Sequence, residues 1–226
     1  MVSHEYRCIF IHIPKCAGTS IENALGHLND HVGRGGQDHR SIRMFEMPLF
    51  SPYVFSSRDN MSEAVRRIKH KYLAVKNPRN KLTVTKEQFD SYFKFAFVRN
   101  PWSRAFSWYT NVMQDEAHLQ RLNLTRHVSF NEFVRQQSGK GELKPQMFWL
   151  KSFDGSIPLN FIGRFENLAE DFQKICEVLR LDPIALPHRG KGSNQDYRDH
   201  YDEESKRIIE EVYREEISAF GYSFDG

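Results

Sequence analysis

Short apolar runs alternate with helix-like patterns along this chain. The runs cover residues 7–13, 93–98 and 160–165. Apolar runs of this length between helical patterns are typical of parallel strands that are buried on both faces of a sheet. Such alternation also implies right-handed crossover connections. The pattern therefore predicts an α/β fold, with a doubly wound, mostly parallel sheet and helices on both of its faces.

Several residues mark where helices are expected to begin. Thr19 or Ser20 can cap a helix that reaches about residue 28. Pro101 suits the first turn of another helix. Further helices are predicted from two sequences that resemble capping boxes, at residues 129–132 and 167–170, and from the apolar spacing over residues 202–220.

Length and composition limit the possible classes of protein. The 226 residues are enough for one sizeable domain, so we expect a single domain over residues 1–226 with an inserted subregion at about 45–91. No apolar run approaches the roughly 18 residues that span a bilayer, and no secretory signal is visible, which predicts a cytoplasmic protein without a membrane span.

The net charge of +3 is too small to indicate nucleic acid but suits an anionic ligand. The three cysteines lack metal-ligand spacing, and no metal is expected.

The segment HIPKCAGTS, residues 12–20, joins the first predicted strand to a helix. Gly18 permits a tight turn and a close approach of a ligand to the backbone. The amides at the start of the helix favour an anion. Lys15 adds a full positive charge, and the hydroxyls of Thr19 and Ser20 add donors. The segment therefore predicts a phosphate-binding loop of the P-loop type, in which Cys16 is a small packing residue.

A second anion site is predicted at FAFVRNPWSRAFSWY, residues 95–109. The strand ends at Val98, so Arg99 falls at its carboxyl end, where ligands bind in open α/β sheets. Arginine is suited to bidentate contact with phosphate. Ser107 lies two turns into the following helix and could face back toward Arg99. Arg99 is therefore expected to share an edge of the sheet with Lys15.

Together, these two segments resemble those of PAPS-dependent sulfotransferases (PAPS is 3′-phosphoadenosine 5′-phosphosulfate). The similarity is to the carbohydrate type, related to heparan and chondroitin sulfotransferases. It extends to residues 161–168 and to the KGS sequence at residues 191–193. The resemblance implies PAPS as the sulfuryl donor, PAP as the product and a carbohydrate-sulfating transferase. It also opens an alternative location, as a lumenal fragment of an anchored, Golgi-type enzyme.

The resemblance also assigns roles to residues of the nucleotide site. The loop is implied to hold the 5′-phosphosulfate, the second segment the 3′-phosphate, and the late glycine-containing segment closes over the nucleotide. The residues so assigned are Lys15, Ala17, Gly18, Thr19 and Ser20 for the phosphosulfate, Arg99 and Ser107 for the 3′-phosphate, and Lys191, Gly192 and Ser193 for the closing loop.

Sulfuryl transfer to a hydroxyl needs a base as well as a stabiliser of the leaving oxygen. Lys15 is predicted to stabilise the charge on that oxygen. Residues 37–43 loosely resemble a segment of the family in which a histidine or a carboxylate takes the acceptor's proton, and this resemblance implies His39 as the base. An unperturbed histidine can be neutral at pH 7 and accept a proton. Asp38, Glu46 or His31 could take its place or orient it. His12, by contrast, is expected to make a hydrogen bond in the core.

The acceptor is predicted as a class only: a hydroxyl, or an amine, of a carbohydrate or small metabolite. The basic residues between 65 and 81 could guide an acidic acceptor or form a solvated helix face. Trp102, Trp108 and Trp149 could stack on a sugar or serve as packing. Two other functions are left open: a P-loop kinase of small molecules or nucleotides, although the G-x-x-x-x-G-K-[ST] spacing is missing, and a non-catalytic nucleotide-binding module. The oligomeric state is not predicted.

Overall fold

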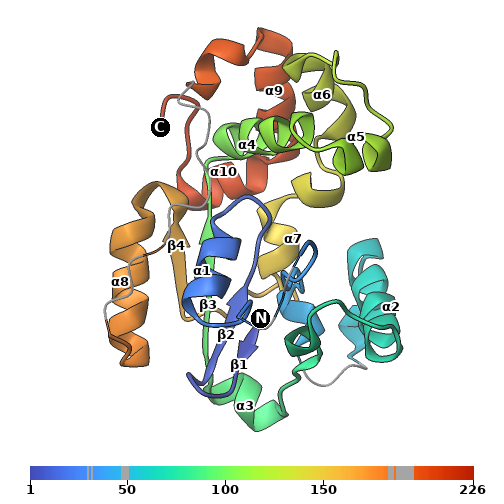
Figure 1. Ribbon diagram of the computed structural model, residues 1–226. Helices are drawn as coiled ribbons and strands as arrows, with labels where there is room; N and C mark the ends of the chain where they lie inside the picture. Colours follow the sequence, from blue (N-terminus) through green and yellow to red (C-terminus); the bar gives the residue numbers. More distant parts are fainter. Residues whose placement is uncertain (30, 32, 47–50, 183–185, 187–195) are drawn as a thin grey trace. The chain divides into compact units, whose positions relative to one another are not determined.

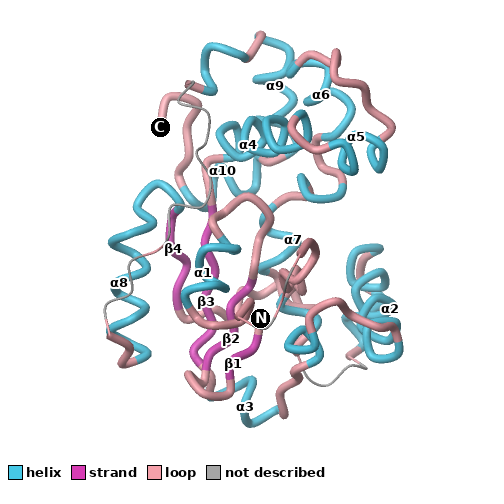
Figure 2. The backbone as a smooth tube through the Cα atoms, viewed as in Figure 1, coloured by secondary structure: helices cyan, strands magenta, loops and turns pink. Residues whose placement is uncertain are grey.

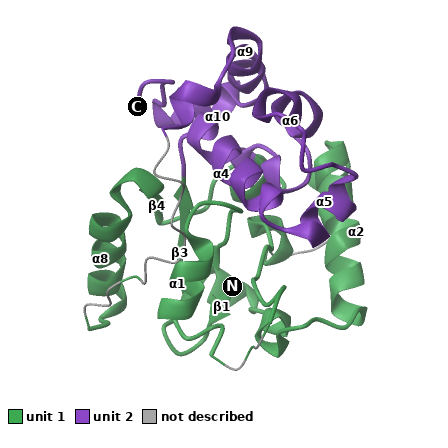
Figure 3. Cartoon of the chain, turned by 45° about the horizontal axis from the view of Figure 1, so that its top comes forward, with its two compact units in different colours: residues 1–98, 148–189 green, residues 99–147, 190–226 purple. Residues whose placement is uncertain are grey.

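The computed structural model describes residues 1–29, 31, 33–46, 51–182, 186 and 196–226. Its chain forms two compact units, one of residues 1–98 with 148–189 and one of residues 99–147 with 190–226 (Figure 3). The expected single domain with one insertion stays a prediction. Among the described residues, no helix combines the length and the apolar character that a membrane crossing requires.

The first unit is built on a four-stranded sheet in the order β1-β2-β3-β4 (Figure 2). Its strands are β1 (Val2–Ser3), β2 (Cys8–Ile11), β3 (Phe93–Val98) and β4 (Phe161–Arg164). β2, β3 and β4 run parallel, and only β1 pairs antiparallel with its neighbour. The α/β class with a mostly parallel sheet is therefore confirmed, as are all three predicted strands. β1 was not predicted.

Buried side chains on both faces hold this sheet in the core. Ile9 and Phe10 of β2, and Phe95 and Ala96 of β3, are at most 1% exposed. This requires cover on both sides of the sheet, because neighbouring residues of a strand point to opposite faces. Two helices of this unit lie around the sheet, namely α1 (Gly18–Ala24) and α8 (Leu168–Leu179), and α8 packs against β4 (Figure 1).

The inserted subregion is mostly helical where the structure describes it. It contains η2 (Pro52–Phe55), α2 (Arg58–Tyr72), η3 (Pro78–Lys81) and α3 (Lys86–Ser91). The hydroxyl of Ser57 caps α2 by accepting from the amide of Asn60, at 3.1 Å. α2 packs on η2 and on η1 (Ile42–Met44), so the insertion lies against the chain that follows α1.

The second unit is helical. It contains α4 (Pro101–Met113), α5 (Glu116–Leu122), α6 (Phe130–Gln137), η4 (Gly141–Leu143), η6 (Tyr197–His200), α9 (Glu203–Val212) and α10 (Arg214–Phe220). α7 (Gln146–Leu150) begins in this unit and leads back into the first. Pro101 starts α4 as predicted, and the Ser129 hydroxyl caps α6 by accepting from the amide of Glu132, at 3.3 Å.

Three helix predictions need correction. Ala17 occupies the N-cap position of α1 in place of Thr19 or Ser20, no side chain caps the helix, and α1 ends at residue 24. Asn167 stands at the start of α8 but makes no side-chain capping bond. The predicted final helix is two helices, α9 and α10, with a break at Tyr213, whose hydroxyl donates to the carbonyl of Leu143 at 2.6 Å and thereby fixes the chain at the break.

Because β3 and β4 are in close contact, we expect any side chain at residue 163 to reduce the stability of the fold. Gly163 lies opposite Phe97 in the sheet, and a Cβ there would approach the buried ring of Phe97 to 2.5 Å. We expect Gly163→Ala to lower the free energy of unfolding by about 1–3 kcal/mol, measured by urea denaturation. In a Phe97→Leu background the penalty should shrink. An equal penalty in both backgrounds would show that the ring is not the cause.

Candidate functional site

The loop between β2 and α1 has an unusual backbone. Lys15 and Ala17 have φ angles of +70° and +64°, in the left-handed region. Outside glycine, this conformation costs on the order of 1–3 kcal/mol at each residue, and it persists where the surrounding structure enforces it, often at ligand-binding sites. The backbone conformation therefore marks the predicted phosphate loop as a candidate site independently of its motif.

The two hydroxyl residues of the motif lie in the first turn of α1. The amide of Ser20 donates to the carbonyl of Ala17 at 3.0 Å, and this bond begins the helix. Thr19 is half-buried, whereas Ser20 is buried. Their assignment to a phosphosulfate group stays a prediction.

Two buried side chains pack the loop from inside. A Cβ at Gly18 would lie only 2.0 Å from the His12 ring, so the glycine is required by this packing. The φ angle of Gly18 is not positive. The turn itself therefore does not need a glycine, which differs from the predicted role of Gly18 in a tight turn. Cys16 is also buried, and its thiol lies 3.7 Å from the carbonyl oxygen of Pro14. Cys16 therefore packs within the loop, as expected.

His12 forms a buried ion-pair contact with Glu22 of α1. Its Nδ1 lies 3.0 Å from Glu22 Oε1, and both side chains are almost completely buried. The same carboxylate oxygen accepts from the amide of Asp38 at 3.0 Å. Burial by itself would raise the pKa of Glu22, but the facing His12 contributes to lowering it. Glu22 is therefore an anion that joins β2, α1 and the segment containing His39.

His39 lies against His12. The two ring centroids are 4.2 Å apart, and His39 Nδ1 is 3.4 Å from the carbonyl oxygen of His12. A carbonyl can only accept, so Nδ1 carries the hydrogen in this contact and Nε2 is the nitrogen that can take up a proton. Burial, reinforced by the nearby His12, lowers the pKa of His39 to about 3. The predicted base is therefore neutral at pH 7 and lies next to the strand that leads into the loop.

The other candidates for the base are engaged elsewhere. Both carboxylate oxygens of Asp38 accept from Arg40, at 2.8 and 2.5 Å. Glu46 accepts from the amide of Phe153 at 3.0 Å. These contacts favour structural roles for both carboxylates. The third candidate, His31, packs its ring against Gly36, where an added Cβ would lie 2.2 Å from it, whereas His39 contacts His12 at the start of the loop.

The insertion holds the His39 segment in place. Arg66 of α2 donates to the carbonyl of His39 at 2.6 Å, and Arg43 donates to the side chain of Asn60, also on α2, at 2.7 Å. Arg67 donates to the backbone carbonyl of Glu46. Part of the basic segment is thus used inside the first unit, whereas Lys69 and Lys71 are exposed.

Arg99, the first residue of the second unit, is fixed by its neighbours there. Its Nε and Nη2 lie 3.0 and 2.9 Å from the hydroxyl oxygen of Ser103. Ser103 is one turn before Ser107 on α4, and residues four apart share a helix face. The sequence analysis named Ser107 but missed Ser103, although the spacing could have indicated both.

A buried glutamine, which the sequence pattern did not indicate, clamps the backbone of Arg99, and a buried glutamate holds that glutamine. The Gln146 side chain accepts from the Arg99 amide and donates to its carbonyl, both at 2.8 Å. Gln146 in turn donates to the buried carboxyl of Glu216 at 2.8 Å. Burial raises the pKa of Glu216. No local pattern signals this arrangement, because its members are far apart in the sequence.

The remaining predicted nucleotide-site residues cannot be placed. Lys191, Gly192 and Ser193 lie outside the described residues. Their assignment to a closing loop therefore stays a prediction.

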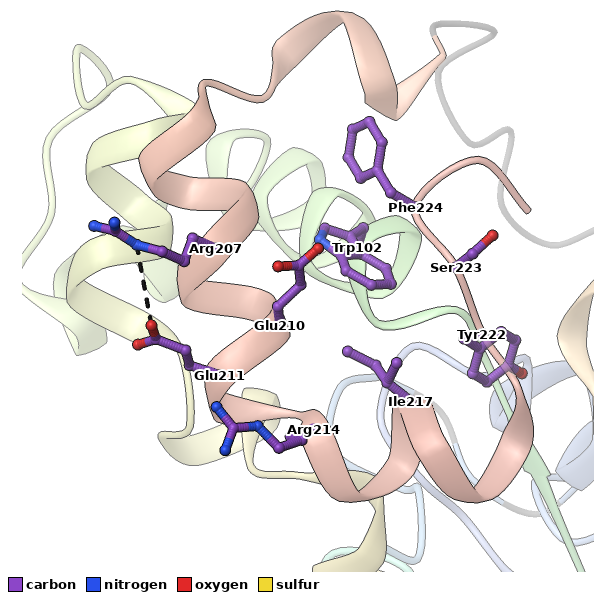
Figure 4. A pocket seen from close by; sticks show the side chains of 9 residues that line it. All are labelled: Trp102, Arg207, Glu210, Glu211, Arg214, Ile217, Tyr222, Ser223 and Phe224. Atoms are coloured by element: carbon purple, nitrogen blue, oxygen red, sulfur yellow. Dashed lines mark ion pairs between the residues drawn. The ribbon is translucent and has the colours of Figure 1, made fainter.

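A hollow of about 500 Å³ in the second unit is lined by Trp102, α9, α10 and the residues that follow α10 (Figure 4). Trp102 is 2% exposed, and its Nε1 donates to the carbonyl of Lys206 at 3.3 Å. Arg207 and Glu211, which also line the hollow, form an ion pair of 4.0 Å. This engagement favours packing over acceptor stacking for Trp102.

Comparison with known proteins identifies the family. A model described as "Sulfotransferase family" matches residues 1–223. The chain belongs to the sulfotransferase family. This membership confirms the resemblance seen in the sequence and agrees with the α/β sheet.

Individual relatives are more distant. The chain is 25% identical over 215 residues to carbohydrate sulfotransferase 14 of Mus musculus and 23% identical over 210 residues to that of Homo sapiens, covering 84% of this chain and 49% of the relative in each case. It therefore spans about half the length of these two relatives. It is also 31% identical over 98 residues to an uncharacterized protein of Archaeoglobus fulgidus, covering 43% of this chain and 76% of that protein. No solved structure matches.

The low pKa of His39 leads us to expect a smaller free energy of unfolding at acid pH. An unfolded histidine binds a proton near pH 6.5, whereas the folded pKa of His39 is about 3. Between these values the unfolded chain binds more protons, so the free energy of unfolding should decrease as the pH falls from about 6.5 toward 3, by at most ~1.4 kcal/mol per pH unit from this group. Urea denaturation across this range should show a smaller slope in His39→Gln than in the wild type.

The control for this prediction is His127→Gln. His127 is exposed, so its replacement should leave the slope unchanged. Equal slopes in the wild type and His39→Gln would contradict a half-buried His39 that stays neutral.

Proposed function

We propose that this protein transfers the sulfuryl group of PAPS to a hydroxyl, or an amine, of a carbohydrate or small-metabolite acceptor. The observation that carries the proposal is the contact of His39 with His12, the residue at the start of the loop that contains Lys15. This contact brings a neutral proton acceptor close to a loop with a positive charge and a left-handed backbone. Family membership favours sulfuryl transfer over a kinase reaction.

The residues present fit the donor's two charged ends. Lys15 and the loop through Ser20 would hold the phosphosulfate, because the loop's unusual backbone indicates a site built for a ligand. Arg99 would hold the 3′-phosphate, with Ser103 and Ser107 as hydroxyl donors on α4. The clamp from Gln146 fixes the backbone of Arg99, which supports this assignment.

In the proposed reaction, bound PAPS supplies a sulfuryl group on a phosphate oxygen. The acceptor oxygen forms a bond to sulfur, and the bond between sulfur and the bridging phosphate oxygen breaks. His39 Nε2 takes the acceptor's proton, and the bridging oxygen keeps the electron pair. Lys15 stabilises the negative charge that develops there.

The low pKa of His39 has a consequence for this role. A base with a pKa of about 3 is a weak proton acceptor, since general bases work best with a pKa near the operating pH. A negatively charged donor bound nearby would raise that pKa, because an opposite charge favours the imidazolium form. We therefore propose that His39 becomes a competent base only when the donor is bound.

The names of the mouse and human relatives favour a carbohydrate acceptor. Trp149 is a candidate to contact the acceptor, because its ring centroid is 6.5 Å from that of His39. Its buried Nε1 has no hydrogen-bond partner among the described residues and could donate to an acceptor oxygen. Cytoplasmic location, or a lumenal place within a longer anchored protein, stays a prediction.

The direct test is incubation with ³⁵S-labelled PAPS and fractionated glycans and metabolites, followed by mass spectrometry. We expect a labelled acceptor whose mass has increased by one sulfonate group, together with PAP. Thermal shift should show stabilisation by PAP. Stabilisation by ATP with Mg²⁺ and none by PAP would overturn the proposal in favour of a kinase.

Two substitutions should separate chemistry from donor binding. His39→Gln should lower kcat about 10²–10⁴-fold while PAP binding persists, because a positioned base contributes a factor of this size. Lys15→Met should lower kcat about 10²–10³-fold through lost charge stabilisation. The matched control is Lys140→Met, which replaces an exposed lysine at the start of η4 and should be silent. Full activity of His39→Gln would remove His39 from the mechanism.

Arg99 should be sensitive even to a substitution that keeps its charge. Arg99→Lys loses the planar guanidinium that can bind phosphate through two hydrogen bonds. We expect its affinity for PAP to fall at least tenfold by calorimetry, while its affinity for adenosine 5′-phosphosulfate, which lacks the 3′-phosphate, stays the same. Equal losses for both ligands would show that Arg99 does not contact the 3′-phosphate.

A further inference from the structure

The helix α2 exposes an apolar stripe. Met61, Val65, Ile68 and Tyr72 are 41%, 50%, 45% and 76% exposed. Their spacings of four, three and four residues place them within an arc of about 60° on a helix with 3.6 residues per turn. The stripe is about 16 Å long at 1.5 Å per residue. A continuous row of exposed apolar side chains is uncommon on a soluble monomer and indicates an interaction surface.

The exposed apolar residues of this chain are concentrated around the stripe. Of the nine large apolar side chains that are exposed in the described residues, seven lie between residues 53 and 73. Phe55 is 78% exposed and Leu73 is 61% exposed. The η2 turn that carries Phe55 is tied to α2, because Asn60 donates to the carbonyl of Tyr53 at 2.7 Å. We call Phe55, Met61, Val65, Ile68, Tyr72 and Leu73 the α2 apolar face.

The opposite side of α2 is polar and packed on the protein itself. Asn60 and Glu63 are buried. Asn60 accepts from Arg43 at 2.7 Å, and Glu63 accepts from the hydroxyl of Ser41. α2 is therefore reversed relative to an ordinary surface helix, which turns its apolar side to the core. Since the polar side is engaged, the apolar side is the one left to meet another body.

The charges beside the α2 apolar face select its partner. Arg58 and Lys69 border one side of the stripe, Lys71 borders the other, and all three are exposed. Asp59 lies well away from the stripe, about 150° around the helix by the same 3.6-residue geometry. A second copy of the chain would bring these cations together, which is unfavourable. A polyanionic glycan would match the cations but would leave the apolar side chains in water.

We propose that the α2 apolar face docks this protein on a bilayer surface rich in anionic lipid headgroups. Apolar and aromatic side chains flanked by lysine and arginine are the features that bind a helix to such a surface. The interaction places the protein on the membrane without crossing it. It is independent of the sulfotransferase reaction and would bring the enzyme to acceptors carried by lipids.

The test is co-sedimentation of the purified full chain with vesicles. We expect binding to vesicles of 30% phosphatidylglycerol in phosphatidylcholine and little binding to pure phosphatidylcholine. The double substitution V65S/I68S should weaken the binding about tenfold, and K69E/K71E by at least as much. High salt should also weaken it, because it screens exposed charges.

Matched controls use residues outside the α2 apolar face. Val178 on α8 is 57% exposed, and Lys140 is exposed at the start of η4, so Val178→Ser and Lys140→Glu should bind vesicles like the wild type. Thermal unfolding should show that every variant is folded. Failure to bind anionic vesicles, or binding that V65S/I68S leaves unchanged, would overturn the proposal. So would a dimer in analytical ultracentrifugation that V65S/I68S dissociates, because a second copy would then cover the face.

Discussion

The imidazole of His12 is the contact on which the candidate site depends. It fills the space that a side chain at residue 18 would need, approaches the Glu22 carboxylate to 3.0 Å and lies against the ring of His39. One buried ring therefore positions the start of α1, the end of β2 and the predicted base. Removing this imidazole would leave the buried Glu22 carboxylate without the ring that faces it, and an uncompensated buried charge is strongly destabilising. The site therefore needs three residues together: the histidine at residue 12, the glycine at residue 18 and the acid at residue 22.

The insertion is part of this arrangement. Arg40 and Arg43 are each only 4% exposed, and burying a guanidinium group is costly unless other groups accept its hydrogen bonds. Arg40 is paired with Asp38 and also donates to the carbonyl of Leu82 at 2.8 Å. Arg43 donates to the carbonyl of Phe148 at 2.5 Å as well as to α2. Residues 51–91 therefore supply partners for buried charges next to His39. Substitutions in the insertion should for this reason alter the site.

The sequence predicted what depends on local pattern. The buried strands and the start of α4 at Pro101 follow from apolar runs and turn chemistry, whereas β1 has only two residues and leaves no periodic signal. The loop motif indicated an anion site but not why residue 18 is glycine, because that depends on the ring of His12. Gln146 and Glu216 are 70 residues apart, and only the fold shows that they clamp Arg99. The sequence also could not predict which side of α2 faces outward, because the partners of its polar side come from residues 41 and 43.

Histidine NMR tests the central claim most directly. The imidazole nitrogens of His12 and His39 can be followed in ¹⁵N-labelled protein as the pH is lowered, with His127 as an exposed reference. We expect His39 to stay neutral well below pH 6, with its hydrogen on Nδ1. Bound PAP should shift the signals of His12 and His39 together and raise the pKa of His39, while the signals of His127 do not respond to PAP. A His39 that titrates near pH 6.5 and does not respond to PAP would contradict the central claim.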